Sequence, residues 1–165
     1  MKGAIIASIL LLVSVRIAGQ TGALTRESDQ WRFARYPAAA HFKGKPARPL
    51  LATDLEHTHR TRIRTEARKG PNFAGRFTLV KWGCGSPCLQ FVIIDARSGT
   101  VYDPGFIVGC SDKNGLEAII DFKPASRLVI ATGHSQELGC GSAFYEWDEK
   151  QLRPVHFQPW PKPSD

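Results

Sequence analysis

The chain lacks any apolar stretch long enough to stay in a membrane. Its longest small and apolar run covers residues 3–15, which is 13 residues, whereas a helix that spans a bilayer needs about 20. Lys2 precedes this run, as in a secretory signal peptide. We therefore expect residues 1–19 to be a signal peptide, with cleavage after Gly19 or Ala23. The mature protein is then secreted or periplasmic, with no transmembrane segment.

Cysteine is scarce, with four residues in 165. In an oxidising compartment four cysteines allow three pairings, of which we favour Cys84 with Cys88 and Cys110 with Cys140. Cys84 with Cys140 is the rival. Three residues separate Cys84 from Cys88, whereas thioredoxin-like sites have two, and no helix is expected after them to lower a thiol pKa. The pattern favours a structural bridge, with a thiol oxidoreductase using Cys84 and Cys88 as the alternative.

Other catalytic and metal-binding patterns are also missing. The chain has no Gly-x-Ser-x-Gly elbow, and we interpret His134 and Ser135 as turn residues, with a hydrolase that uses them as the alternative. His57 and His59 would point to nearly opposite sides of a helix, and His41, His134 and His156 have no ligand spacing. The sequence therefore predicts no metal, no cofactor and no catalytic residue. It leaves open whether the protein is an enzyme, and favours a non-enzymatic role.

Positive charge is concentrated near the N-terminus. Residues 24–69 contain 11 Lys and Arg against 5 Asp and Glu, whereas residues 70–165 contain 9 against 10. Any attraction for an anionic partner is therefore expected in the N-terminal third.

A basic helix is expected within this third. Thr53 or Asp54 can cap it, and Gly70 with Pro71 can end it after Lys69. Glu56 lies one turn before Arg60, at ion-pair spacing. Its thin apolar stripe consists of Leu55, His59, Ile63 and Ala67.

Three arginines recur every fourth residue of this helix and form one ridge, at Arg60, Arg64 and Arg68. Guanidinium groups bind carboxylates and phosphates in a planar, two-point geometry. The ridge therefore predicts binding to an acidic protein or an anionic envelope component. The alternative is a solvated helix face that aids solubility. Nucleic acid is not expected, because no strand platform of aromatic and basic residues is evident.

After Gly75 the sequence turns to short β-rich runs separated by turn residues. Gly99 suits a hairpin loop that needs a positive φ. Seven strands are predicted, over residues 76–82, 89–95, 100–103, 118–122, 127–132, 142–147 and 152–157. The fold class is mainly β (α+β), with antiparallel β-meanders that resemble propeller blades. The chain is too short for a closed propeller.

The expected organisation has three parts. The signal peptide is followed by an extended arm over residues 20–52, which we expect to pack through isolated aromatics. Residues 53–165 form a single β-rich domain that begins with the helix. A weak repeat, in which Gly83-Cys84-Gly85-Ser86 recurs as Gly139-Cys140-Gly141-Ser142, suggests two related meanders.

Four motifs carry a family resemblance. They are Gly70-Pro71-Asn72-Phe73-Ala74-Gly75, Trp82-Gly83-Cys84-Gly85-Ser86-Pro87-Cys88, Asp95-Ala96-Arg97-Ser98-Gly99 and Tyr145-Glu146-Trp147. Together they resemble an uncharacterised family of small exported bacterial proteins. The resemblance implies export and a β-rich fold, and it implies no activity. It also suggests two independent disulfide bridges, since the Cys84 and Cys88 pair is the more characteristic one.

These observations favour a non-enzymatic binding, inhibitory or envelope-interaction module. The hypothesis is that it docks an acidic partner on the ridge formed by Arg60, Arg64 and Arg68.

Overall fold

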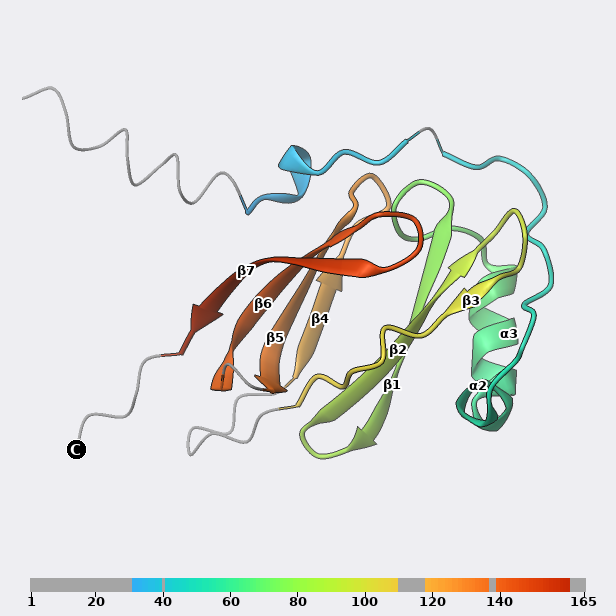
Figure 1. Cartoon of the computed structure of the whole chain (residues 1–165). Helices are drawn as coiled ribbons and strands as arrows, with labels where there is room; N and C mark the ends of the chain where they lie inside the picture. Colours follow the sequence, from blue (N-terminus) through green and yellow to red (C-terminus); the bar gives the residue numbers. More distant parts are fainter. Residues whose placement is uncertain (1–30, 40, 110–117, 137–138, 161–165) are drawn as a thin grey trace, which may run out of the picture. The chain divides into compact units, whose positions relative to one another are not determined.

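The strands of the described residues form two antiparallel sheets (Figure 1). The computed structural model describes residues 31–39, 41–109, 118–136 and 139–160. Within these residues, the first sheet contains β1 (Phe77–Gly85), β2 (Cys88–Asp95) and β3 (Val101–Tyr102). The second contains β4 (Ile119–Phe122), β5 (Leu128–Gln136), β6 (Gly139–Trp147) and β7 (Leu152–Pro159). Each sheet is a meander in chain order and no closed propeller forms, so the predicted fold class is confirmed.

The first sheet is packed on both faces. Successive side chains of its strands point to opposite sides, so each face has its own set of apolar residues. One face packs against the second sheet in a single apolar cluster, which includes Phe77, Leu79, Phe91, Ile93, Ile120, Val129, Ala131 and Trp147. The other face packs against a helix, in a separate cluster formed by Ile63, Ala67, Val80, Trp82, Val92 and Ile94. The first sheet is therefore the middle of three layers.

The expected helix is present, but it is divided into α2 (Asp54–Thr58) and α3 (Arg60–Arg68). His59 lies between them with φ −95° and ψ 14°, outside helical geometry. Its ring stacks on that of Trp82, with 4.2 Å between centroids. Ile63 and Ala67 are buried as the stripe predicted, and Gly70 follows α3 with φ +93°.

Thr53 caps α2, in a capping box with Glu56. The Thr53 hydroxyl accepts from Glu56 N at 3.3 Å, and the Glu56 carboxylate accepts from Thr53 N at 3.3 Å and from Ala52 N. Glu56 is only 3% exposed. The expected pair of Glu56 with Arg60 was therefore wrong, because the helix N-terminus occupies this carboxylate.

The described part of the arm is held along the sheets by aromatic contacts and backbone hydrogen bonds. Trp31 stacks on His156 with 4.1 Å between centroids, ahead of the short 3₁₀ helix η1 (Phe33–Arg35). Tyr36 O accepts from Arg127 N at 2.7 Å, and Phe42 N donates to Gly75 O at 3.0 Å. The arm thus crosses the ends of both sheets before it reaches α2.

The Gly-Cys-Gly-Ser repeat does not mark equivalent positions. Gly83, Cys84 and Gly85 end β1, before a hairpin turn, whereas Gly139 begins β6, after one. The two meanders share their order and direction of strands, but the repeated residues lie on opposite arms of their hairpins.

Candidate anion-binding pocket

The structure divides the predicted arginine ridge. Arg64 and Arg68 lie one helical turn apart and line the same pocket, of about 420 Å³. Arg60 does not line it. Its Nη1 donates to His57 O at 3.1 Å, so this guanidinium satisfies a carbonyl at the end of α2. The candidate site is therefore built on the second and third arginines of the ridge.

The opposite wall of the pocket is the arm segment Lys45–Pro49. Two backbone hydrogen bonds hold this segment against the loop between β2 and β3. Ala47 N donates to Ala96 O at 2.8 Å, and Leu50 N donates to Gly99 O at 2.8 Å. Prolines at 46 and 49 also restrict φ within the segment. The wall is therefore fixed by the fold before any ligand arrives.

Gly99 permits this close approach. Its φ is +81°, and a Cβ built on it would meet the carbonyl oxygen of Arg48. Glycine is the residue that combines a positive φ with room for a neighbouring backbone. The positive φ was expected for the hairpin loop, but its role in seating Arg48 was not.

Among the described residues, four cationic ones line the pocket, two from each wall, and no carboxylate does. They are Lys45, Arg48, Arg64 and Arg68. The remaining lining is small and apolar, from Pro46, Ala47, Pro49 and Ala67. Such a site combines strong positive charge with a surface that can contact an uncharged group.

None of these four cations has an ion-pair partner in the described part of the chain. The nearest acidic residue along α3, Glu66, pairs instead with Lys69 at 2.7 Å. On a helix, residues 64 and 66 point in nearly opposite directions. Arg64 and Arg68, at i and i+4, therefore repel each other without a compensating charge.

Arg64 also has an unsatisfied donor. Its Nε is buried and has no hydrogen-bond partner among the described residues. A second such nitrogen is Trp147 Nε1, which belongs to a neutral ring packed edge-on against Phe77 and Tyr102. Since a buried donor without an acceptor costs about 1–3 kcal/mol, and more when charged, Arg64 Nε lowers the stability of the fold where it lies.

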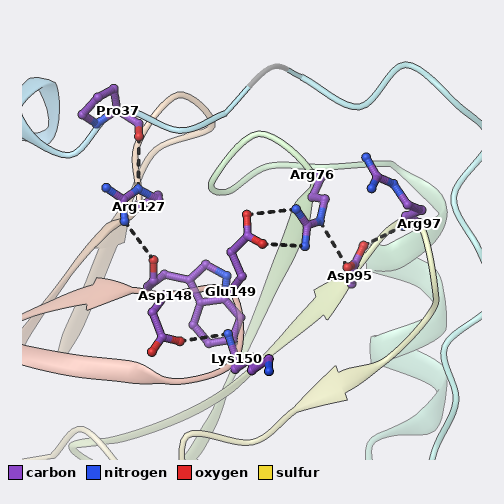
Figure 2. Close-up of polar contacts among 9 residues, drawn as sticks. Pro37, Arg76, Asp95, Arg97, Arg127, Asp148, Glu149 and Lys150 are labelled. Atoms are coloured by element: carbon purple, nitrogen blue, oxygen red, sulfur yellow. Dashed lines mark hydrogen bonds and ion pairs between the residues drawn. The ribbon is translucent and has the colours of Figure 1, made fainter.

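A second charged cluster, formed by Arg76, Asp95 and Glu149, contrasts with this pocket because these three charges are paired (Figure 2). Arg76 Nη1 and Nη2 donate to both carboxylate oxygens of Glu149, at 2.9 and 3.1 Å, and Nε donates to Asp95 at 3.2 Å. Burial alone would lower the pKa of Arg76, but these hydrogen bonds raise it overall. This cluster ties the first sheet to the β6–β7 turn, so we assign it a structural role.

Cys84, Cys88 and Cys140 do not line the pocket. Cys84 and Cys88 form a disulfide, with Cα atoms 5.1 Å apart, so the predicted pair is present and the rival pairing of Cys84 with Cys140 was wrong. Cys140 is itself disulfide-bonded. Cys110 lies outside the described residues, so the pairing of Cys110 with Cys140 stays a prediction.

His134 and Ser135 belong to β5, which continues to Gln136, so their assignment to a turn was wrong. A register shift between Thr132 and His134, at Gly133 with φ +82°, lets the strand continue past the expected end. The side chains of both residues lie outside the described part of the chain. The structure therefore gives no distance or orientation that bears on the hydrolase alternative.

Sequence reasoning missed Lys45 and Arg48. Their signal is two basic residues interleaved with prolines at 46 and 49, a pattern typical of a rigid extended segment. What it does not indicate is the surface on which that segment lies.

Comparison with known proteins adds no assignment: no protein-family model, no curated protein and no solved structure matches the chain. The family resemblance read from the motifs therefore stays a prediction. In the described residues, no helix is both long enough and apolar enough to cross a membrane.

Proposed function

We propose that the protein is an exported, non-enzymatic binding module that docks an acidic partner, an acidic protein or an anionic envelope component, through the basic face of α3. One observation carries the proposal. Lys45, Arg48, Arg64 and Arg68 gather around one pocket, and no carboxylate of the described part of the chain lines it. Cations held together in this way attract anions over distances set by the ionic strength.

Export is the second part of the proposal. The apolar run after Lys2 has the length of a signal peptide, and the disulfide between Cys84 and Cys88 is typical of proteins that fold in an oxidising compartment. Both observations favour a partner at the cell envelope or outside the cell.

The test uses the full chain and fluorescently labelled poly-L-glutamate, with binding measured by anisotropy over a series of salt concentrations. The variant replaces Arg60, Arg64 and Arg68 together with Ala. We expect its binding to be weaker and less dependent on salt, since fewer ion pairs form. Arg60 is included because it belongs to the predicted ridge although it lies outside the pocket.

A matched control removes the same charge elsewhere, by replacing Arg62, Arg97 and Lys150 with Ala. These side chains are exposed and none of them lines the pocket. We expect the control to retain most of the wild-type binding. Equal binding by the wild type and the ridge variant at every salt concentration would eliminate docking through α3.

A further inference from the structure

We propose that the pocket between the arm and α3 binds a phosphate monoester group, with the organic part of the ligand lying on the apolar lining. This inference rests on the proposed function and narrows it to one ligand chemistry. It depends on the charge, the donor arrangement, the size and the rigidity of the pocket.

Charge favours a dianion. The lining that the structure describes has four cations and no carboxylate. A carboxylate supplies one negative charge, whereas a phosphate monoester carries about −1.5 to −2 near pH 7, with its second pKa near 6. The monoester therefore neutralises more of the repulsion between Arg64 and Arg68.

The donor arrangement favours a tetrahedral group over a planar one. Arg64 and Arg68 approach from the helix side, and Lys45 and Arg48 approach from the arm side. A carboxylate presents two oxygens in one plane, which suits one guanidinium fork. A phosphate monoester has three terminal oxygens pointing in different directions, so it can accept from both walls.

The size and lining favour an ester over free inorganic phosphate. A volume of about 420 Å³ lies within the range of pockets that hold small organic ligands, which is roughly 300–1,000 Å³. Pro46, Pro49 and Ala67 offer no hydrogen-bonding side chain, so the ligand portion against them is uncharged. The phosphate then occupies the cationic part and its organic substituent the apolar part.

The pocket is also rigid before binding. The arm is fixed to the β2–β3 loop through Ala47 and Leu50, and α3 is fixed to the first sheet through Ile63 and Ala67. Little ordering of the backbone is therefore needed when a ligand binds, which lowers the free-energy cost of association.

Three probes with one phenyl ring separate the possible ligand chemistries: phenyl phosphate, phenyl sulfate and benzoate. Binding to the full chain is measured by calorimetry at pH 7.5. We expect phenyl phosphate to bind at least tenfold more tightly than either other probe. We also expect its affinity to fall at pH 5, where the monoester is mostly a monoanion. Equal binding of all three probes, or no saturable binding of phenyl phosphate, would overturn the proposal.

Two variants test the walls separately. Arg64→Gln and the double variant Lys45→Gln with Arg48→Gln should each weaken phenyl phosphate binding at least tenfold. Arg62→Gln, on the same helix but outside the pocket, should change it less than twofold. Folding is checked by circular dichroism and thermal unfolding. Equal losses of phenyl phosphate affinity in Arg62→Gln and Arg64→Gln would refute the site. If one helix variant unfolds, the arm variant still tests it, since unchanged affinity in the arm variant would also refute the site.

The source of the phosphate is tested with vesicles. Phosphatidylcholine vesicles containing phosphatidate, which is a monoester, are compared with vesicles containing phosphatidylglycerol, which is a diester. Selective binding to phosphatidate indicates a lipid headgroup, and binding of phenyl phosphate alone indicates a soluble ligand. Either result supports the monoester. If phenyl phosphate fails to bind while poly-L-glutamate still binds through Arg64 and Arg68, this inference fails and the proposed function stands.

Discussion

Replacing Gly99 with Ala should separate the arm from the β2–β3 loop. A Cβ at this position would meet the Arg48 carbonyl oxygen, which is backbone and cannot rotate away. The arm must therefore shift, and the hydrogen bonds from Ala47 N to Ala96 O and from Leu50 N to Gly99 O are lost or weakened. The same shift moves Lys45 and Arg48 away from α3.

The magnitude follows from two contributions. A side chain at a left-handed φ costs roughly 1–2 kcal/mol, and each of the two hydrogen bonds contributes about 1 kcal/mol. We therefore expect Gly99→Ala to lower the free energy of unfolding by about 3 kcal/mol. Gly105 is the matched control, because it also has a positive φ, +74°, but nothing lies within 4 Å of its Cβ position. Gly105→Ala should cost only about 1 kcal/mol.

The assay is thermal and denaturant unfolding of both variants, with phenyl phosphate binding as a second measurement. For a domain of this size the difference of about 2 kcal/mol corresponds to roughly 7 °C in Tm. Gly99→Ala should also weaken phenyl phosphate binding, whereas Gly105→Ala should not. If the two variants lose equal stability, the contact between Gly99 and the arm does not contribute to the free energy of unfolding. The argument for a rigid pocket wall is then refuted.

Three further variants test the framework of the fold. Asn72→Ala removes the side chain that bonds both Leu79 N and Leu79 O, so chemical unfolding should show a loss of about 2 kcal/mol, and a loss below 0.5 kcal/mol would contradict this role. Glu149 has φ +78°, so Glu149→Gly should be about 1 kcal/mol more stable than Glu149→Ala, since both lose the same ion pair; equal stabilities would show that no strain is relieved. The hydrogen bond from Arg153 lowers the pKa of Asp148 below its ordinary value of 3.8, so its stabilising effect is present above pH 4 and is lost as pH falls; Arg153→Leu should raise this pKa in a carboxyl NMR titration, and no rise would exclude the pair as its cause.

Local signals explain why the strands were predictable. The strands after Gly75 are short β-rich runs bounded by turn residues, and the hairpin loop that ends at Gly99 contains its own positive-φ residue. Such signals depend on neighbours along the chain rather than on distant contacts. The signal for the start of α2 was also local, since Thr53 and Glu56 have the spacing of a capping box. The Thr53 cap was predicted and is present, but the role of Glu56 in the capping box was missed because Glu56 was assigned to an ion pair.

The errors involve features that sequence spacing does not determine. The apolar stripe keeps a four-residue spacing across His59, so it predicts one helix even though the chain turns there to stack His59 on Trp82. β5 continues to Gln136 because the register shifts at Gly133. A bulge adds a residue without changing the local composition, which is why a strand end near Thr132 was expected.

The pocket was the least predictable feature because its two walls are distant in sequence. The helix wall was predicted from the spacing of Arg64 and Arg68. The arm wall depends on Arg48 lying against Gly99, which is 51 residues further along the chain. No periodicity within the arm indicates this contact.

The pocket wall and the Cys84–Cys88 disulfide lie near opposite ends of β2. β2 begins at Cys88, beside the Cys84–Cys88 bridge, and ends at Asp95, next to the loop that holds the arm. An eight-residue strand spans roughly 23 Å at about 3.3 Å per residue. The bridge therefore closes one end of the hairpin while Gly99 positions the arm near the other. The proposed anion binding thus depends on charge in the N-terminal third, whereas the bridge contributes to the stability of the sheet that carries the pocket.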